Sequence, residues 1–473
     1  MGALYALELV FRRRYTVKIG VGEKQVPKLF SAKSSKTQEI QKKPTFVDIF
    51  AGCGGLSLGL MQAGWDGLFA IEHDKYAFET LNNNLIEKES GNKFSWPASL
   101  PKTAHSVYSI LEDNTDFLKG YAGKVDMLVG GPPCQGFSSA GKRNISDPRN
   151  KLVEAYLEFV KVLQPKVLLI ENVRGITSSF SDASDPEVKT NYANQIINSL
   201  SVDYNVSTKV LDTSSFGVPQ RRQRFFIIAF RKNVARESLN PFFEIEQDRP
   251  QFLKLKTIGS IPVSSKQAIS DLEIKKNGVA VSRDTAGFME ISYSGPLTSY
   301  QKLMNAGGIS PLSDTRLARH RPEISDRFEK IIRLCHADGR LNVSLSAEIK
   351  ASFGLKKSAI RVLDPSAPSP TITSMPDDLI HYSEPRTLTV RENARLQSFP
   401  DWFTFHGKYT SGGSLRRKEV PRFTQVANAV PPLAAEAIGL TIARLIESER
   451  DFNLVPEAVE LKARRSILDI QEA

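Results

Sequence analysis

The chain has 473 residues, of which 41% are hydrophobic and 24% charged, proportions that are typical of a soluble globular protein. No apolar run approaches the roughly 20 residues of a membrane-spanning helix, and three cysteines with six histidines indicate neither a disulfide framework nor a structural metal site. The formal charge of +11 and the pI of about 9.3 favour a polyanionic partner; we expect no membrane association and no metal.

Residues 1–43 form a basic N-terminal extension. They hold ten Lys and Arg against three Glu, including the run Arg12, Arg13 and Arg14. Two interpretations remain open, namely a basic arm that lies on a phosphate backbone and a partly disordered leader, which we favour slightly.

A packed domain begins at residue 45 with a strand (residues 45–50), a glycine turn (residues 51–55) and the start of a helix. Such a turn lets a ligand approach the backbone and the positive end of the helix. The next predicted strand ends in Glu72, a carboxylate about twenty residues further on that is well placed to hold ribose hydroxyls. The turn lacks the pattern GxGxxG, so we predict a nucleoside ligand without a pyrophosphate.

The alternation of strands and helices continues to residue 231. We predict a helix over residues 152–163 and strands over residues 106–110, 125–129, 165–173 and 225–230. This rhythm is typical of a parallel sheet with helices on both faces. Residues 240–370 then show no clear period, which indicates a second, irregular domain with an amphipathic helix at residues 319–331. Regular structure returns at residues 389–400 and in a helix over residues 423–447.

The sequence GGPPCQGFS, residues 130–138, follows the predicted strand at residues 125–129. Its glycines and prolines place Cys134 on a rigid turn at the carboxyl end of that strand, where open α/β sheets bind ligands. A thiolate in this position is a candidate nucleophile. Glu171 ends the next strand, and the arginines of QRRQR (residues 220–224) precede the last one, so these groups together suggest covalent attack on a polarised ring.

The chain resembles the cytosine-5 DNA methyltransferase family, in particular its bacterial modification enzymes. FVDIFAGCGGLSLGL, GGPPCQGFS, ENV, QRRQR, VRENARLQSFP and QVANAVPP occur in the order of that family and span residues 46 to about 440. The resemblance implies an α/β fold, a Rossmann-like mixed sheet of the S-adenosylmethionine-dependent methyltransferases, with a smaller irregular target-recognition domain. It implies a catalytic domain over residues 44–235, closed by residues 424–455, a target-recognition domain over residues 236–423 and a tail over residues 456–473.

The resemblance also implies the catalytic roles. Cys134 attacks carbon 6 of cytosine, which makes carbon 5 nucleophilic enough to accept a methyl group. Glu171 holds ring nitrogen 3 and the exocyclic amine, Arg224 the carbonyl oxygen, and Arg222 supports the site.

The family pattern assigns S-adenosyl-L-methionine to the glycine turn and its surroundings: Asp48, Phe50, Ala51, Gly52, Gly54, Gly55, Leu56, Glu72, Pro133 and Asn428. One position departs from this pattern. The third strand of the family carries an aspartate near the adenine, and the alignment places Ser109 there, with Asp113 as the nearest acid.

The implied partner is double-stranded DNA, from which the target base must be extruded. The segment at residues 138–151 resembles the mobile loop that closes over the flipped base. The predicted DNA contacts are Gln135, Ser138, Lys142, Arg143, Arg149 and Gln220. We expect a monomeric enzyme that lies in the cytoplasm, associated with the nucleoid. A cognate restriction endonuclease is a further expected partner.

Two other functions remain as alternatives. A transfer RNA cytosine-5 methyltransferase shares the sheet and the cysteine, but the long variable region and GFS after PPCQ argue against it. A catalytically dead DNA-binding regulator is disfavoured because Cys134, Glu171, Arg222 and Arg224 are all intact. No motif in the variable region reveals the target sequence.

Overall fold

A six-stranded mixed sheet organises the computed structural model, which describes residues 42–88, 91–132, 151–178, 180–181, 189–259, 262–308, 311–357, 359–412, 415 and 418–449. The sheet has the strand order β2-β1-β3-β4-β8-β7. Its strands are β1 (Thr45–Ile49), β2 (Asp66–Ile71), β3 (Met127–Gly130), β4 (Val167–Val173), β7 (Tyr204–Asp212) and β8 (Gln223–Arg231). β2, β1, β3 and β4 are parallel, whereas β8 runs antiparallel to both β4 and β7.

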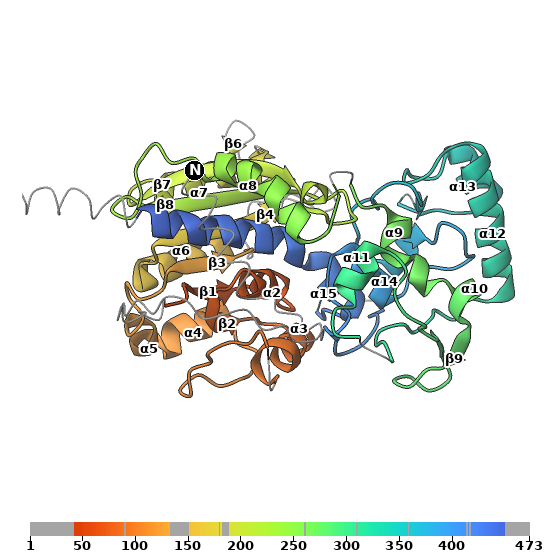
Figure 1. Cartoon of the computed structure of the whole chain (residues 1–473), viewed down its shortest axis with the longest axis horizontal. Coiled ribbons are helices and arrows are strands. Elements are labelled where there is room, and N and C mark those ends of the chain that lie inside the picture. Colours follow the sequence, from red (N-terminus) through yellow and green to blue (C-terminus); the bar gives the residue numbers. More distant parts are fainter. Residues whose placement is uncertain are drawn as a thin grey trace, which may run out of the picture. The chain divides into compact units, whose positions relative to one another are not determined.

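Helices cover both faces of the sheet (Figure 1). On one face, the apolar side chains pack against α4 (Val107–Asp113), α5 (Thr115–Lys119), α6 (Lys151–Leu163) and α7 (Tyr192–Leu200). On the other face they pack against α2 (Gly55–Gln62), α3 (Lys75–Leu81), α8 (Pro241–Leu255) and the helix over residues 432–449. The predicted mixed α/β fold with two covered faces is confirmed.

The prediction of a strand at residues 106–110 is wrong, because this segment begins helix α4. The Ser106 hydroxyl accepts a hydrogen bond from the backbone N–H of Tyr108 at 3.3 Å and so caps the helix. The side chains of Val107 and Ile110, three residues apart, are both buried on one face of the helix. Strand β7 has no counterpart in the sequence predictions, since it lies at the edge of the sheet and most of its side chains are partly exposed.

The C-terminal helical region covers one face of the sheet. The predicted helix at residues 423–447 is α15 (Arg422–Asn428) followed, after a break at residues 429–431, by a helix over residues 432–449. A Cβ on Gly59 of α2 would lie 2.4 Å from the carbonyl oxygen of Pro432, so the two helices touch through backbone. The stretch Arg422–Glu449 is long and apolar enough to cross a membrane, but 83% of its most apolar window is buried inside the protein, as in a core helix.

Helix α8 follows β8 and packs with the sheet. Phe242, Ile245 and Phe252 join the same core as α2 and the helix over residues 432–449. Arg444 on that helix contacts Glu244 at 2.8 Å. The structure therefore places α8 with the sheet, beyond the predicted domain boundary at residue 235.

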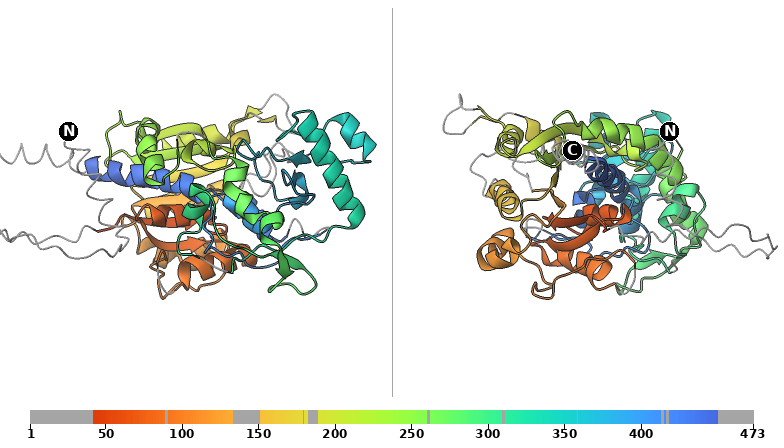
Figure 2. Two further views of the ribbon diagram at one scale, coloured as in Figure 1. Left: turned by 45° about the vertical axis from the view of Figure 1, so that its right-hand side comes forward. Right: turned by 60° about the vertical axis from the view of Figure 1, so that its left-hand side comes forward.

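The remaining segments form small elements (Figure 2). Some of them join the large core through residues such as Ile269, Tyr300 and Leu396, and others pack around two minor apolar clusters. The amphipathic helix predicted at residues 319–331 is confirmed as α12, which buries Ile331, Ile332 and Cys335. The elements are β5 (Phe180–Ser181), β6 (Lys189–Thr190), α9 (Ser265–Ile269), α10 (Ile274–Asn277), β9 (Val279–Val281), β10 (Met289–Ile291), α11 (Ser299–Met304), α12 (Pro322–Ala337), α13 (Ala347–Ser352), β11 (Arg361–Val362), β12 (Leu379–Ile380) and α14 (Val390–Leu396).

Arg395 of α14 connects several of these segments from a fully buried position. Its guanidinium contacts Asp401 at 2.6 Å and Asp271 at 3.2 Å, and all three side chains are inaccessible to solvent or nearly so. The two carboxylates raise the pKa of Arg395 against the opposing effect of burial. A buried cation between two fixed carboxylates is costly to disrupt, because removing one partner leaves uncompensated charge in the interior.

We expect Arg395→Met to lower the free energy of unfolding by about 3–5 kcal/mol, the usual cost of breaking a buried ion pair. Urea denaturation followed by circular dichroism measures this loss. Arg333→Met is the matched control, because Arg333 pairs with Glu329 on an exposed helix face and should hardly matter. Equal effects of the two substitutions would contradict the anchoring role of Arg395.

Candidate active site

A cavity of about 1650 Å³ opens at the carboxyl ends of β1, β2 and β4. The sheet contributes the turn after β1, the residues after β2 and the end of β4. Segments far away in the sequence complete the wall, namely residues 374–377, residues 410–412 and α15. The cavity therefore lies at the sheet edge where the sequence predicted a ligand.

The turn after β1 and the carboxylate of Glu72 form one side of this cavity. Phe50 and Gly52 have φ values of 63° and 57°, and the backbone N–H of Gly52 donates to Glu72 Oε2 at 2.8 Å. The backbone N–H of Asp74 donates to Glu72 Oε1 at 2.7 Å. Burial raises the pKa of Glu72, although these two hydrogen bonds oppose the shift. Two backbone donors thus hold the carboxylate in a fixed orientation.

Gly54 and Gly55, both predicted to bind the cofactor, do not line the cavity. A Cβ on Gly54, whose φ is 92°, would lie 2.8 Å from a methyl carbon of Leu85, and one on Gly55 would lie 2.5 Å from the carbonyl oxygen of Val430. The structure therefore assigns both glycines to close packing behind the turn. Asp48, Phe50, Ala51, Gly52, Leu56, Glu72 and Asn428 do line the cavity.

Asp48 is a buried carboxyl group at the floor of the cavity. Its Oδ2 accepts a hydrogen bond from the Ser57 hydroxyl, while Oδ1 is buried and has no partner among the described residues. Burial raises the pKa of Asp48 to about 7, with the Ser57 hydrogen bond opposing this effect and the charge of Glu72 adding to it. A carboxyl oxygen without a protein partner, on a residue that lines a cavity, is suited to a cationic or hydrogen-donating ligand.

Glu171, Arg222 and Arg224 meet on the other side of the cavity. Because β8 runs antiparallel to β4, Arg224 pairs in register with Val173, two residues beyond Glu171. Arg224 Nε lies 3.0 Å from Glu171 Oε1. A Cβ on Gly131 would lie 3.3 Å from Glu171 Oε2, so the chain after β3 passes directly over this carboxylate.

Arg222 is a buried cation that lines the same cavity. It is 2% exposed, and its Nε and Nη1 have no hydrogen-bond partner among the described residues. Burial, together with the charge of Arg224, lowers the pKa of Arg222, whereas Glu171 opposes this shift. Two donors that are held ready without a protein acceptor are suited to a ligand oxygen.

Several predicted site residues lie outside the described part of the chain. They are Pro133, Cys134, Gln135, Ser138, Lys142, Arg143 and Arg149. The described residues next to them, Gly131 and Pro132, line the cavity. Asn172 Nδ2 donates to the carbonyl oxygen of Pro132 at 3.1 Å and fixes the chain there.

Gln220, predicted to contact DNA, is instead fully buried. Its Nε2 donates to Gln397 Oε1 at 2.7 Å, and its Oε1 accepts from the backbone N–H of Ile372 at 2.9 Å. Arg221 and Arg222 beside it point to different environments, exposed and buried respectively. The structure thus corrects Gln220 to a buried link between the sheet and α14.

The sequence analysis missed some of the cavity wall. Ser109, the aligned position for an adenine contact, lies on α4 outside the lining, and so does Asp113; His105, Ser106 and Tyr108 line the cavity instead. Because Val107–Asp113 form a helix, the aligned position Ser109 does not lie on a strand of the sheet. Residues 374–377 also contribute, although no motif in that region pointed to them. In the part of the chain that the structure describes, no group of His, Cys, Asp or Glu is suited to a metal ion.

Comparisons with known proteins agree with this geometry. A sequence model of the family C-5 cytosine-specific DNA methylase matches residues 44–444. The Type II methyltransferase M.DdeI of Desulfomicrobium norvegicum is 32% identical over 443 residues, which cover 89% of this chain and 94% of the relative. The Type II methyltransferase M.XorII of Xanthomonas oryzae pv. oryzae is 29% identical over 423 residues, 86% of each chain.

A crystal structure from E. coli is similar in fold. It is described as a DNA modification methyltransferase encoded within a prophage, and it aligns with a TM-score of 0.58 and 26% identity over 86% of this chain and 100% of the other. Family match, relatives and fold all agree with the sheet-edge cavity and its acidic and basic groups. The chain therefore belongs to the C-5 cytosine-specific DNA methylase family and is a DNA cytosine-5 methyltransferase.

Proposed function

We propose that the protein methylates carbon 5 of cytosine within a specific duplex DNA sequence, with S-adenosyl-L-methionine as the methyl donor. The arrangement of Glu171, Arg222 and Arg224 in one cavity with Glu72 and Asp48 is the observation that carries this proposal. Glu171, Arg222 and Arg224 are suited to a polar ring, and Glu72 and Asp48 to a nucleoside. Both groups line the same cavity, as transfer of a methyl group between two ligands requires.

Cys134 is the proposed nucleophile. Its thiolate forms a bond to carbon 6 of the flipped cytosine, and the ring electrons move toward carbon 5. Carbon 5 would then take the methyl group of the sulfonium donor, whose carbon–sulfur bond breaks and leaves a thioether. Carbon 5 loses its proton to solvent or a nearby base, and the bond to Cys134 breaks as the aromatic ring is restored. Pro132 and Gly131 lie at the cavity, so Cys134 follows two residues after a position that lines it.

Glu171 and the arginines offset the charge that develops on the ring. Glu171 is the proposed partner of ring nitrogen 3 and the exocyclic amine, and Arg224, 3.0 Å from it, fixes its orientation. The free Nε and Nη1 of Arg222 make this residue a second candidate donor to the cytosine carbonyl oxygen, besides Arg224. Preorganised donors in a buried site need little rearrangement during the reaction.

The residues present on the other side of the cavity suit S-adenosyl-L-methionine. Glu72, held by two backbone N–H groups, has the chemistry to accept ribose hydroxyls, and the unsatisfied Oδ1 of Asp48 suits a cationic group. A Cβ on Gly52 would meet nothing within 4 Å, so the turn leaves room for a ligand against its backbone. When bound, this cofactor supplies an electrophilic methyl group.

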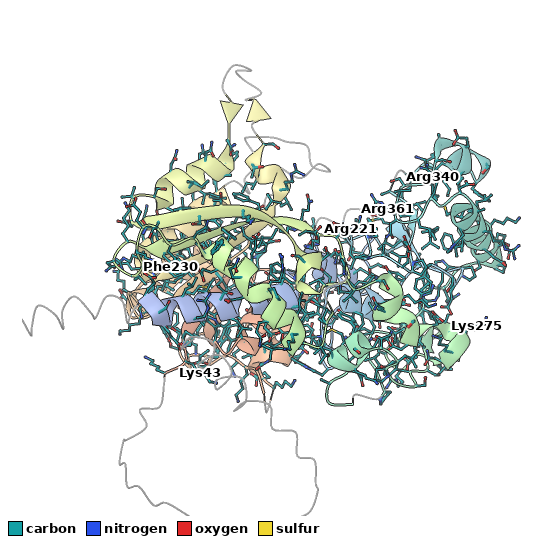
Figure 3. The ribbon with its side chains drawn as sticks, turned by 45° about the horizontal axis from the view of Figure 1, so that its top comes forward. Lys43, Arg221, Phe230, Lys275, Arg340 and Arg361 are labelled. Carbon is teal, nitrogen blue, oxygen red and sulfur yellow. The ribbon has the colours of Figure 1, made fainter. Side chains whose placement is uncertain are left out.

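Basic side chains outside the cavity support a DNA path. Figure 3 shows Arg221, Arg361 and Arg340 following one another from the edge of the sheet toward α12. Arg221 and Arg340 are exposed, and contacts with phosphates position a protein on duplex DNA. The base is extruded into the cavity. We further propose that the enzyme is a cytoplasmic monomer and that its methylation protects DNA against a cognate restriction endonuclease.

The central test uses duplex DNA with 5-fluorocytosine at the target position, found first by bisulfite sequencing of DNA from a host that expresses the chain. Fluorine at carbon 5 cannot leave as a proton does, so the reaction should stop at a covalent protein–DNA adduct that survives denaturation. Cys134→Ser should form no adduct and transfer no methyl groups, while still binding DNA, because a hydroxyl is far less nucleophilic than a thiolate. Methylation of ordinary DNA without an adduct on the fluorinated site would contradict the covalent mechanism, and labelling of transfer RNA alone would contradict the substrate.

A second prediction concerns Asp48. Between its ordinary pKa of 3.8 and about 7, the folded carboxyl keeps a proton that the unfolded one has lost, so the free energy of unfolding should fall as pH rises through this window. Asp48→Asn should remove this contribution. The free energy of unfolding of the variant minus that of the wild type should therefore be larger at pH 8 than at pH 5. Urea midpoints at both pH values measure it, with Asp116→Asn as the exposed control. A difference between variant and wild type that is the same at both pH values would contradict the raised pKa of Asp48.

A third prediction concerns the DNA path. If Arg221 and Arg340 each contact a phosphate, replacing either by Gln should reduce the slope of log affinity against log salt concentration by about 0.9. Fluorescence anisotropy titrations between low and moderate salt measure this slope. Lys161→Gln is the control, because Lys161 already pairs with Glu158 on α6. Unchanged slopes for both arginine variants would exclude them from the DNA interface.

A further inference from the structure

Arg422 is the first residue of α15, the helix that the C-terminal region contributes to the cavity wall. Thr424, Gln425, Ala427 and Asn428 of this helix line the cavity, whereas Arg422 does not. Its side chain extends instead toward segments that lie more than 100 residues earlier in the chain. The first residue of the helix is thus tied to distant segments through a side chain that does not itself line the cavity.

Two carboxylates bind the Arg422 guanidinium. Nη1 lies 2.8 Å from Asp284 Oδ2 and 3.0 Å from Asp314 Oδ1. Nε donates to the carbonyl oxygen of Gly407 at 3.0 Å, and the backbone N–H donates to the carbonyl oxygen of Lys408 at 2.8 Å. The orientation of α15 is therefore fixed at its first residue by three separate segments of the predicted target-recognition region.

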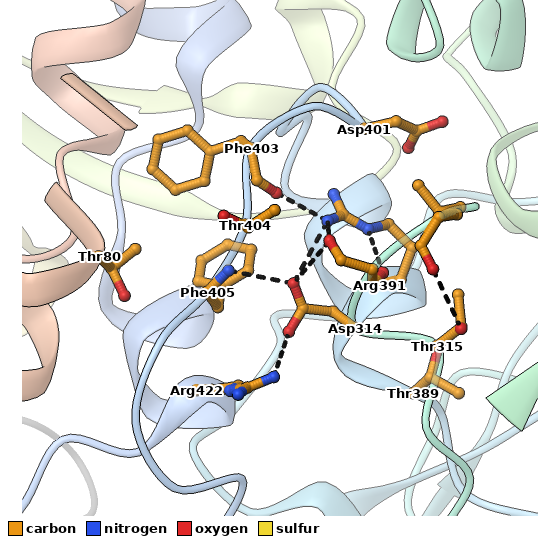
Figure 4. A network of polar contacts seen from close by, with 12 residues as sticks. Thr80, Asp314, Thr315, Thr389, Arg391, Asp401, Phe403, Thr404, Phe405 and Arg422 are labelled. Atoms are coloured by element: carbon orange, nitrogen blue, oxygen red, sulfur yellow. Dashed lines mark hydrogen bonds and ion pairs between the residues drawn. The ribbon is translucent and has the colours of Figure 1, made fainter. Parts of the chain in front are cut away.

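Asp314 is a rigid anchor within this network (Figure 4). Its side chain is fully buried, and it also accepts hydrogen bonds from Arg391 Nη2 at 3.4 Å and from the backbone N–H of Phe405 at 3.0 Å. Arg391 in turn donates to the carbonyl oxygen of Phe403 at 2.7 Å. A carboxylate held by several donors keeps one position, so its partner Arg422 is held as well.

Asp284 is the more accessible anchor. It lies in the turn between β9 and β10 and accepts a hydrogen bond from the Tyr409 hydroxyl at 2.7 Å. The Tyr409 ring is covered by the guanidinium groups of Arg316, at 3.6 Å, and Arg422, at 4.2 Å. Hydrogen bonds from Tyr409, Thr285 and Arg422 outweigh burial and lower the pKa of Asp284, so the carboxylate is charged at neutral pH.

The middle of α15 contacts both the sheet domain and the residue that follows α14. The Thr80 hydroxyl donates to Gln425 Oε1 at 2.7 Å, and Gln397 Nε2 donates to the carbonyl oxygen of Val426 at 2.8 Å. Cys53, in the glycine turn, contacts the carbonyl oxygen of Gln425 at 3.6 Å. A change in the tilt of α15 would therefore displace the wall that faces the glycine turn.

We propose that Arg422 is a positioning residue through which the β9–β10 turn and Asp314 set the shape of the cofactor side of the cavity. The inference rests on the proposed function, since it takes this side of the cavity as the site of S-adenosyl-L-methionine. Among the described residues, the side chain of Asp284 bonds to Ser282, Thr285, Tyr409 and Arg422, none of which lines the cavity. A substitution there therefore tests transmission and not ligand contact.

The test measures S-adenosylhomocysteine binding to the full chain by isothermal titration calorimetry. Arg422→Gln and Asp284→Asn should each weaken binding by about fivefold to tenfold, at the low end of couplings between separate sites. Arg422→Lys should recover part of the loss, because an ammonium still reaches one carboxylate. The double variant Arg422→Gln with Asp284→Asn should bind no more weakly than Arg422→Gln alone, since the two residues act through one contact.

Arg444→Gln is the matched control. Arg444 also forms ion pairs, with Glu244 and Asp248, on the helix that follows α15, but it lies away from the cavity wall. Its loss should leave affinity within twofold of the wild type. Wild-type affinity in Asp284→Asn and Arg422→Gln, or equal weakening in Arg444→Gln, would overturn the inference. Failure of the wild type to bind at all would instead overturn the cofactor proposal and the inference with it.

Discussion

The antiparallel pairing of β8 with β4 is the constraint on which the active site depends. Four parallel strands alone would bring only their own carboxyl ends to the sheet edge. The reversal of β8 brings an amino-terminal end to the same edge, so Arg222 and Arg224 arrive opposite Glu171. Cationic and acidic groups from two distant parts of the sequence are thereby fixed by backbone hydrogen bonds, with no need for a loop to order them.

Buried charge holds the remaining parts of the cavity in place. Arg395, Arg391 and Arg386 all lie in or near α14, are at most 7% exposed, and each meets at least one buried carboxylate. Such pairs add little net stability over an apolar core, but each tolerates only one arrangement of its partners. The irregular segments between residues 262 and 412 therefore keep a defined geometry despite their short helices and strands.

Much of the fold could be predicted because its signals are local. The apolar strands at residues 125–129, 165–173 and 225–230 and the helix at 152–163 are contained in single stretches of sequence, and the structure has each of them within a few residues. Glu72 could be predicted because it lies about twenty residues after a glycine turn, and Asp48 because it falls within a motif of the family that the sequence resembles. These positions depend on spacing along the chain, which a sequence displays directly.

Several errors arose where a tertiary contact decides the outcome. Gln220 is interpreted as a DNA contact until its buried partners Gln397 and Ile372 are seen. The strand predicted at residues 106–110 is a different kind of error, because the Ser106 cap that begins α4 is a local hydrogen bond to Tyr108. Gly54 serves packing against Leu85, a residue that no turn motif includes. Residues 374–377 reach the cavity through the path of the chain alone, so no local pattern marks them.

The contact between Gly59 and Pro432 has a consequence for the order in which the protein folds. The Trp65 indole N–H likewise bonds to the carbonyl oxygen of Gly439, 374 residues away in the chain. During synthesis, the first strand and helix emerge long before the segment that covers them, so their apolar face stays exposed until the ribosome has made Pro432 and Gly439. Closure of such distant pairs is slow, and the exposed intermediate is prone to aggregate. The cavity wall, completed by α15, thus forms only after Arg422–Asn428 have been made.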